Sequence, residues 1–412
     1  MQYNGHLPTA SRCAIDGVEP ARTVEPTTPE AIADLLADAA SSRLGVAPVG
    51  GATTLGLGNP IERYDIAMST GQLRNILDYE PMDLVLSVEA GARFVDVQAV
   101  LGEHGQHLPV ETPFPDRATI GGMIATARSG PRRLSSGSLR DLLIGMSVAH
   151  ASGTVTKCGG MVVKNVSGYD LPRVYHGSLG TLGIITSANF KIVPLPRAER
   201  TIIGGLQLLD EAVATVGRLQ QTGLPFVAVE MMSESGKWRV AVRFEGRERS
   251  VETIAESAKH ALADAPEELA DTASRAWWQQ YLDDQAADDG VIAVRCSVRP
   301  RDTLNLVRDI EAHIRRHNVA DHRMWASPGM GTVSTRWTYP ANDPAAIAKM
   351  VALHADLIGL ANHTVVTAAP IDVKRRIDIW GAEPDTLDVM RQLKHEFDPS
   401  RVLNPGRFAG RL

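Results

Sequence analysis

Apolar residues recur at helical spacing near the start of the chain and are followed by a short, wholly apolar run. Thr28-Pro29-Glu30 supplies a capping hydroxyl, a proline for the first turn and an acid near the positive end of the helix dipole. The apolar positions that follow on one helical face are Ile32, Leu35, Leu36 and Ala39. The sequence therefore predicts a helix that begins near residue 28, then a strand at Val46–Val49 that leads into a glycine-rich loop, residues 50–58.

Further apolar runs predict strands and a helix in the next part of the chain. Leu84–Val88 predicts a strand, and Phe94, Val97 and Leu101 form one face of a helix. Ser152-Gly153 stands between Leu142–Ala149 and Val155–Cys158, which predicts a β-hairpin. Glycines are dense from about residue 118 to 183, where we expect short strands and loops.

The pattern changes beyond about residue 198, where strands alternate with longer helices. The expected strands are Arg239–Phe244, Val291–Cys296 and Thr364–Ala368. The expected helices are Leu209–Gln221, Val251–Ala263, Thr303–Asn318 and Pro344–Leu360, with a last one over Leu387–Phe397. This alternation predicts an α+β fold with helices over an antiparallel sheet.

Length and charge set limits on the class of protein. A chain of 412 residues is long enough for two domains. Its formal net charge of −6 argues against a nucleic-acid partner, because binding a phosphate backbone requires a basic face. No apolar run approaches the roughly 20 residues that span a bilayer, and the first residues lack a signal-peptide pattern. We therefore expect a cytoplasmic protein.

The cysteines and histidines argue against a metal or a cluster held by this chain. Cys13, Cys158 and Cys296 are far apart and form no C-x-x-C, so no iron–sulfur cluster or zinc ribbon is expected from this chain alone. His322 and His363 are isolated, and the sequence has no H-x-H-G-D-G-N motif. We expect no bound metal.

The glycine-rich loops suggest a nucleotide-like ligand, because glycine lets the main chain approach phosphates closely. The two common nucleotide motifs are absent. Leu57 stands where a P-loop has lysine, and no G-x-G-x-x-G links a strand to a helix.

Four segments and the chain's end carry a resemblance that is more specific. The segments are PVGGATTLGLG (48–58), ATIGGMIATARSGPRR (118–133), GGMVVKNVSGYDLPRV (159–174) and GSLGTLGIIT (177–186), followed by LNPGR (403–407). In order and spacing they resemble the vanillyl-alcohol-oxidase-type FAD oxidoreductases. GPRRLSSGSLRD (130–141) and KNVSGYDL resemble the E-type glycolate oxidase subunits. The resemblance implies a two-lobed PCMH-type FAD-binding domain at 15–197, an α+β cap domain at 198–398, and a segment at 399–412 that returns to the FAD site.

The resemblance also implies a set of cofactor-binding residues. They are Val49, Gly50, Gly51, Ala52, Thr53, Thr54, Pro113, Thr119, Gly121, Gly122, Thr126, Gly180, Gly183, Ile184, Ile185, Asn404, Gly406 and Arg407. The family usually has glycine at the position of Ala52, and the alanine fits readily only if its φ is negative. We expect a side chain at Gly51 to fill the space of the pyrophosphate while affecting folding little.

Two expectations concern how the FAD is held. Hydride transfer to flavin N5 builds negative charge at the N1–C2=O edge, where a fixed cation such as Arg407 would stabilise the reduced form. Relatives with covalent flavin commonly attach it to a histidine in the first loop. Residues 48–58 contain none, so we expect non-covalent FAD. We also expect Asn165 and Tyr169 to brace loops around the cofactor.

The substrate side is less defined by the sequence. Oxidation of a 2-hydroxy acid needs a cation for the carboxylate and a base for the hydroxyl proton. Arg132, Arg133, Arg140 and Arg336 are candidate cations, and our substrate-site candidates are Arg133, Arg336 and His363. No residue stands out as the base, so the catalytic residues stay unassigned.

The resemblance implies a subunit of a complex. We expect an FAD-binding subunit of a glycolate (2-hydroxy acid) oxidase or dehydrogenase, with a larger FAD subunit and an iron–sulfur subunit as partners. The complex would lie in the cytoplasm, with peripheral contact to the inner membrane through those partners. The first alternative is a structural or electron-relay flavoprotein subunit without a substrate site of its own. The second is a cofactor-free assembly subunit.

Overall fold

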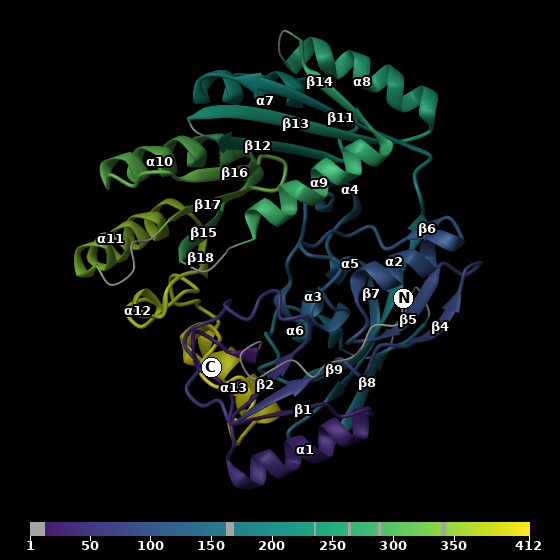
Figure 1. Ribbon diagram of the computed structural model, residues 1–412, viewed down its shortest axis with the longest axis vertical. Helices are drawn as coiled ribbons and strands as arrows, with labels where there is room; N and C mark the ends of the chain where they lie inside the picture. Colours follow the sequence, from purple (N-terminus) through teal and green to yellow (C-terminus); the bar gives the residue numbers. More distant parts are fainter. Residues whose placement is uncertain (1–12, 162–168, 235, 263–264, 287–289, 339–342) are drawn as a thin grey trace. The chain divides into compact units, whose positions relative to one another are not determined.

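The computed structural model describes residues 13–161, 169–234, 236–262, 265–286, 290–338 and 343–412, which divide into two compact units (Figure 1). Unit 1 comprises Met1–Arg128, Ser138–Leu195 and Glu383–Leu412. Unit 2 comprises Ser129–Gly137 and Pro196–Ala382. The domain limits expected from the sequence, near residues 197 and 398, stay a prediction.

The first lobe of unit 1 is a small parallel sheet with one covering helix. Its strand order is β1 (Arg22–Val24), β3 (Ile66–Ser69) and β2 (Val46–Val49). Helix α1 (Pro29–Ser42) begins as predicted, since the amide of Ala31 donates to Thr28 Oγ1 at 3.1 Å. Ile32 and Leu36 are fully buried and pack in one cluster with the strands. This cluster fixes the direction in which the chain leaves β2.

The second lobe of unit 1 is a five-stranded antiparallel sheet. Its order is β4 (Ile76–Glu80), β5 (Val85–Glu89), β9 (Ile184–Lys191), β7 (Leu143–Ala149) and β8 (Val155–Gly159). The β7–β8 hairpin is confirmed. Helices α2 (Phe94–Glu103) and α3 (Ile120–Thr126) contribute Phe94, Val97 and Ile124 to its core. Strands β6 (Gln106–His107) and β10 (Val193–Pro194) form a separate pair.

The expectation of only strands and loops over 118–183 was wrong. The described residues of this stretch contain four short helices: α3, α4 (Arg133–Ser136), α5 (Leu139–Leu142) and α6 (Pro172–Tyr175). Local capping explains two of them. Thr119 accepts a hydrogen bond from the amide of Gly122, and Asp141 accepts one from the amide of Ser138. Such caps stabilise a single helical turn even where glycine lowers the intrinsic helix propensity.

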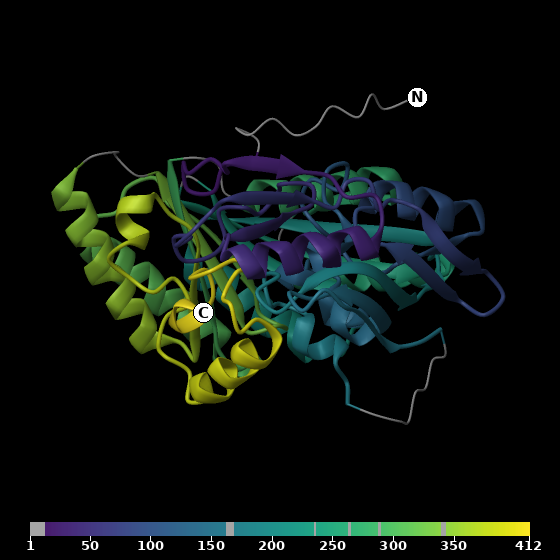
Figure 2. The same cartoon turned by 90° about the horizontal axis from the view of Figure 1, so that it is seen from below.

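The end of the chain returns to the first lobe of unit 1 (Figure 2). Helix α13 (Leu387–Phe397) leads into a segment that extends the edge of β2, where the amide of Val46 donates to Val402 O at 2.7 Å. The amide of Asn404 donates back to Val46 O at 2.8 Å. The segment ends in the short helix η3 (Ala409–Arg411). These bonds place Asn404 and Arg407 beside the loop that follows β2.

Unit 2 is built on an eight-stranded antiparallel sheet, as the α+β expectation required. Its order is β14 (Glu267–Ala270), β11 (Ala198–Leu206), β13 (Lys237–Gly246), β12 (Ala228–Glu234), β16 (Arg323–Ser327), β17 (Thr332–Thr338), β15 (Val291–Ser297) and β18 (His363–Ala368). Its described helices are α4, given above, α7 (Leu209–Gln221), α8 (Glu248–Leu262), α9 (Asp271–Gln285), η2 (Pro300–Asp302), α10 (Thr303–Arg316), α11 (Pro344–Leu360) and α12 (Ile371–Lys374).

The two faces of this sheet differ in chemistry. Alternation along β13 points Val240, Val242 and Phe244 to one face and Arg239 and Arg243 to the other. Helix α9 packs on the polar face. Its buried contacts include Ser274 Oγ to Glu199 Oε1 at 2.5 Å, Trp278 Nε1 to Thr201 Oγ1 at 2.7 Å and Tyr281 Oη to Glu230 Oε2 at 2.6 Å.

No helix within the described residues is long and apolar enough to cross a bilayer.

Candidate functional site

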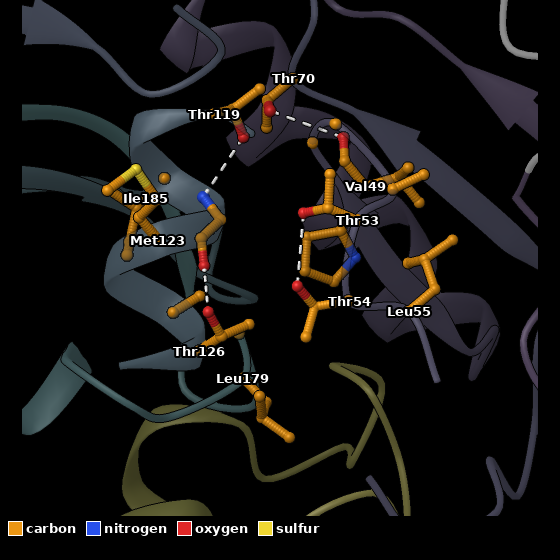
Figure 3. Close-up of a pocket in the computed structure, with 18 of the residues that line it drawn as sticks. Val49, Thr53, Thr54, Leu55, Thr70, Thr119, Met123, Thr126, Leu179 and Ile185 are labelled. Carbon is orange, nitrogen blue, oxygen red and sulfur yellow. Dashed lines mark hydrogen bonds between the residues drawn. The ribbon is translucent and has the colours of Figure 1, made fainter. Parts of the chain in front are cut away.

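A cavity lies within unit 1 (Figure 3). Its walls come from the loop after β2, the start of α3, the loop before β9 and the C-terminal segment. Predicted site residues that line it are Val49, Gly50, Gly51, Ala52, Thr53, Thr54, Thr119, Gly121, Gly122, Thr126, Gly180, Gly183, Ile184, Ile185, Asn404 and Arg407. Segments far apart in the sequence thus meet at one cavity.

The loop after β2 exposes main-chain donors to this cavity. Among the described residues, the amides of residues 51–54 donate to no carbonyl. The hydroxyls of Thr53 and Thr54 lie 3.3 Å apart beside them (Figure 3). Buried or half-buried amides normally have a partner, and successive free amides form a concave site for an anion. This wall is therefore suited to a phosphate or pyrophosphate.

Close main-chain packing explains the two glycines of this loop. A Cβ at Gly50 would collide with the hydroxyl of Thr119, and a Cβ at Gly51 would collide with the main-chain carbonyl of Arg117. The expectation that a side chain at Gly51 would affect ligand binding far more than folding was wrong, because the clash is with the protein's own backbone. Glycine at this position is needed to build the loop itself.

Ala52 has the positive φ that would favour glycine, 55°. The condition under which the alanine would fit readily, a negative φ, is therefore not met. An L-residue in the left-handed region costs on the order of 1 kcal/mol, which the loop tolerates. Ala52 nevertheless lines the cavity with its neighbours, and its side chain is half-buried.

The opposite wall is α3 with its cap residue Thr119. Thr119 caps the helix, and Thr126 Oγ1 donates to Gly122 O at 2.8 Å (Figure 3). A Cβ at Gly121 would collide with Ala90, so close packing requires glycine there, and both Gly121 and Gly122 line the cavity. A helix start carries a partial positive charge, which adds to the attraction that the first loop offers an anion.

A third wall joins the loop before β9 to the end of the chain. Asn404 Nδ2 donates to Leu179 O at 2.5 Å, and Asn404 is buried. Gly180 has φ 70°, and a Cβ there would press on the ring of Pro48. Ile184 and Ile185 add apolar surface. This end of the cavity suits a flat, apolar ring system rather than a phosphate.

Arg407 is a buried cation at the cavity. Its side chain is 3% exposed, and Nη2 donates to the carbonyls of Leu55 and Leu57. Burial lowers the pKa of Arg407 to about 10, while the nearby Asp16 and Tyr64 act in the opposite direction. The guanidinium stays charged at neutral pH and fastens the glycine-rich loop to the C-terminal segment.

Two predicted residues do not line the cavity, and several that do were not predicted. Pro113 and Gly406 lie outside the lining set. Tyr169 is 93% exposed and is not part of it, and Asn165 lies outside the described residues. The unpredicted lining residues are Pro48, Leu55, Leu57, Thr70, Thr112, Ala118, Met123, Ala125, Arg128 and Leu179. Arg128 stands in the quoted segment 118–133, so its charge was the signal available.

The three substrate-site candidates all belong to unit 2. Strand register pairs Arg336 with Ala293 and His363 with Ser297, so both side chains share the sheet face of Arg295. Burial and the charge of Arg133 lower the pKa of Arg295. No carboxylate within the described residues forms an ion pair with Arg133 or Arg295. Sequence reasoning missed Arg295, which stands in an ordinary strand pattern.

Arg132 is not available to bind a substrate carboxylate, because its charge is already paired. It is buried and forms an ion pair with Glu245, beside the Arg243–Glu199 pair of 2.8 Å. Arg140 lies on α5 in unit 1, whereas the other candidates belong to unit 2. Of the candidate cations, Arg133 and Arg336 therefore remain, and Arg295 joins them.

Comparison with known families identifies two segments of the chain. Residues 20–169 match the FAD binding domain, and residues 380–408 match the C-terminal domain of FAD linked oxidases. These two segments contain the cavity walls after β2, at α3 and at the C-terminus. The amides of residues 51–54 and the apolar third wall fit the pyrophosphate and the ring system of FAD.

Curated relatives agree with the family match. The chain is 38% identical over 184 residues to glycolate oxidase subunit GlcE of Escherichia coli (strain K12), which covers 44% of this chain and 51% of that protein. It is 30% identical over 234 residues to a D-lactate dehydrogenase of Anaerostipes hadrus, which covers 55% and 48%. These matches span about half the length of the relatives. A D-lactate dehydrogenase of Archaeoglobus fulgidus is 24% identical over 94% of this chain and 91% of its own length.

Solved structures confirm the fold. Alkyldihydroxyacetonephosphate synthase superposes with a TM-score of 0.66 at 16% identity, over 94% of this chain and 77% of that chain. At this identity the likeness concerns the fold alone. The two-lobed FAD-binding fold expected from the resemblance is confirmed.

Proposed function

Because two segments of this chain match the FAD binding domain and the C-terminal domain of FAD linked oxidases, we propose that it is the FAD-binding subunit of a complex that oxidises glycolate or a similar 2-hydroxy acid. The observation that carries the proposal is the run of amides at residues 51–54, in a loop that lines the cavity of unit 1. The relatives named for glycolate and D-lactate support this substrate class.

The cavity residues divide into two roles in this proposal. The amides of residues 51–54, the hydroxyls of Thr53 and Thr54 and the start of α3 hold the pyrophosphate. The third wall, with Gly180, Ile184 and Ile185, receives the rings, and Asn404 fixes that wall by its bond to Leu179. Arg128 and Arg407 supply positive charge at the cavity. The described lining residues include no histidine, cysteine or tyrosine, which agrees with non-covalent binding.

FAD supplies the acceptor for a hydride from the hydroxy-bearing carbon. The protein's part is to hold the substrate's carboxylate and to exclude other reactions. In this proposal Arg133 and Arg295 bind the carboxylate, since two neighbouring guanidinium groups without a carboxylate of their own attract an anion. Arg336 and His363 lie on the same sheet face and belong to the proposed site. The residue that accepts the hydroxyl proton is not assigned.

Electrons must leave through a partner in this scheme. The three cysteines are free and stand apart, so they offer no set of thiolates for a cluster. We propose a larger FAD subunit and an iron–sulfur subunit as partners, in the cytoplasm and with peripheral contact to the inner membrane. A relative named as a glycolate oxidase subunit supports the existence of partners.

A relay subunit without a substrate site is the second candidate. It is favoured by one observation on the sequence: the H-x-H-G-D-G-N metal motif, which the resemblance attributes to the subunits that oxidise 2-hydroxy acids, is absent. The relay candidate retains the same FAD cavity and requires no carboxylate site at Arg133 and Arg295.

Absorption spectra test the proposal and separate the two candidates. The purified chain is expected to show the bands of oxidised flavin, and acid precipitation should release the flavin into the supernatant. Anaerobic glycolate or D-lactate should then bleach these bands in the chain or in its complex. Bleaching of the larger subunit's flavin alone would support the relay, and a colourless chain that does not take up added FAD would overturn both candidates.

A further inference from the structure

Two histidines and an aspartate converge where helices α10 and α11 of unit 2 pack together (Figure 1). His313 and His317 are four residues apart, in the last turn and at the C-cap of α10, so their side chains lie on one face. Asp356 stands on α11. Its Oδ2 lies 3.2 Å from His313 Nδ1 and 2.8 Å from His317 Nε2. One ligand atom from each residue lies within 4.8 Å of the others.

This cluster offers what a transition metal needs. Two imidazole nitrogens and one carboxylate oxygen face a common point, and three protein ligands with an open position are a usual zinc set. Ligand atoms around a tetrahedral zinc ion are roughly 3.3 Å apart, so small side-chain rotations would complete the geometry. The side chains of His313, His317 and Asp356 are 19%, 17% and 37% exposed, which leaves room for a water ligand.

The surroundings favour a cation at this point. The cluster lies at the C-terminal end of α10, where the unpaired carbonyls give the helix its negative end. Two basic side chains of these helices are engaged with other groups. Arg315 is paired with Glu311 at 2.9 Å, and Lys349 donates to the carbonyl of Asn318 at 3.4 Å.

We propose that His313, His317 and Asp356 form a zinc site that fastens α11 to α10. Imidazole with a single carboxylate selects zinc or a similar divalent transition metal over Mg²⁺ or Ca²⁺, which prefer an all-oxygen shell. The site is separate from the FAD cavity and does not depend on the proposed function. The sequence predicted no metal, but the H-x-x-x-H spacing of His313 and His317 on an expected helix was the available signal.

Zinc binding to the full-length chain tests this site. The chain is stripped with a chelator, and Zn²⁺ is titrated in competition with a chromogenic chelator. The wild-type chain should bind one Zn²⁺, while His317→Gln and Asp356→Asn should bind it at least about tenfold more weakly. His322→Gln is the matched control, because His322 bonds to Glu311 on the same helix and outside the cluster.

Thermal unfolding gives a second measurement that is independent of enzymatic activity. Zn²⁺ should raise the Tm of the wild type and of His322→Gln but not that of Asp356→Asn, since a ligand stabilises only the fold that binds it. Mg²⁺ at the same concentration should leave every Tm unchanged. If the wild type binds no Zn²⁺, or if His317→Gln and Asp356→Asn bind it as well as the wild type does, the cluster is a hydrogen-bonded contact only and the proposal is wrong.

Discussion

Lys394 and Asp398 form an ion pair of 2.7 Å in the interior of unit 1, with side chains 4% and 0% exposed. Lys394 Nζ also donates to the carbonyls of Thr181 and Leu403, at 2.8 and 2.9 Å. Asp398 accepts from the amide of Leu403 at 2.8 Å. Burial lowers the pKa of Lys394, and the Asp398 carboxylate opposes that shift. The pair therefore joins α13, the loop before β9 and the segment that leads to Asn404.

Lys394→Met should destabilise the chain strongly, because it leaves a buried carboxylate without its cation. Loss of one partner of a buried pair costs about 3–5 kcal/mol, which urea unfolding followed by far-UV circular dichroism measures. Arg391→Met on the same helix is the control, since Arg391 and Asp388 are 51% and 88% exposed, and it should change little. Equal stability of the two variants would contradict a supporting role for the Lys394–Asp398 pair.

Ala52→Gly should preserve or improve FAD affinity and raise stability slightly. The left-handed φ of Ala52 costs about 1–2 kcal/mol, and glycine removes this cost while adding roughly 0.5–1 kcal/mol of chain entropy on unfolding. Ala52→Val should weaken FAD binding, because a β-branched residue is strained further at this φ. FAD titration followed by fluorescence quenching compares the three chains. An affinity that fell in Ala52→Gly and was unaffected in Ala52→Val would refute this account of the loop.

Arg407→Lys should weaken FAD binding by at least about tenfold although the charge is kept. The guanidinium donates to the carbonyls of both Leu55 and Leu57, and a single ammonium on a flexible stem does not reproduce this planar contact. The loop that carries Thr53 and Thr54 would then be held less firmly. The measurement is the Kd for FAD, together with the Tm of the apo chain. Wild-type affinity in Arg407→Lys would show that charge alone matters at this position.

The sequence predicted the walls of the cavity better than it predicted unit 2. Glycines and threonines in segments 48–58, 118–133 and 177–186 leave a local signal, because a main chain that must lie open to a ligand restricts the residue type at each position. Helix α9 leaves only a weak signal in the sequence. Its buried side mixes Ser274, Trp278 and Tyr281 and packs on polar strand residues. Hydrophobic periodicity does not detect a helix whose covered face is partly polar.

Residues whose role depends on distant partners were missed for a related reason. In the sequence Lys394 looks like an exposed lysine of an amphipathic helix, and only the fold brings Thr181 and Leu403 to it. Arg295 is likewise an ordinary polar position of a strand until α4 brings Arg133 close to it. Contacts between residues more than 100 positions apart leave no pattern in a single sequence.

Glu311→Gln should reduce stability at neutral pH and have progressively less effect in acid. The hydrogen bond from His322, followed by weaker effects of Arg315, lowers the pKa of Glu311 below its usual 4.5. A carboxyl with a lowered folded-state pKa stabilises the fold above its unfolded pKa, and this contribution is lost as the pH falls through the folded value. Urea midpoints of both chains between pH 7 and pH 3.5 should therefore converge below about pH 4.5. Parallel curves over this range would contradict the assignment.

Arg295→Met should lower the efficiency of 2-hydroxy acid oxidation while leaving the fold as stable as before or more so. Burial and the neighbouring Arg133 both disfavour the charged guanidinium, and within the described residues no carboxylate offsets them. An apolar side chain of similar length removes this cost, so the urea midpoint should stay the same or rise. FAD affinity should be unchanged, because Arg295 lies in unit 2 and the FAD cavity in unit 1.

The kinetic effect follows from the proposed role of Arg295 in holding the substrate carboxylate. In the complex with its partners, KM for glycolate should rise at least about tenfold, as expected when a charge-assisted contact is lost. Thr335→Val, a matched change on the paired strand β17 that lies opposite Val294 and so on the other sheet face, should leave KM near the wild-type value. A structural role for Arg295 would instead lower the urea midpoint and leave KM unchanged. That outcome would favour the relay candidate, because the cation pair would then bind no substrate.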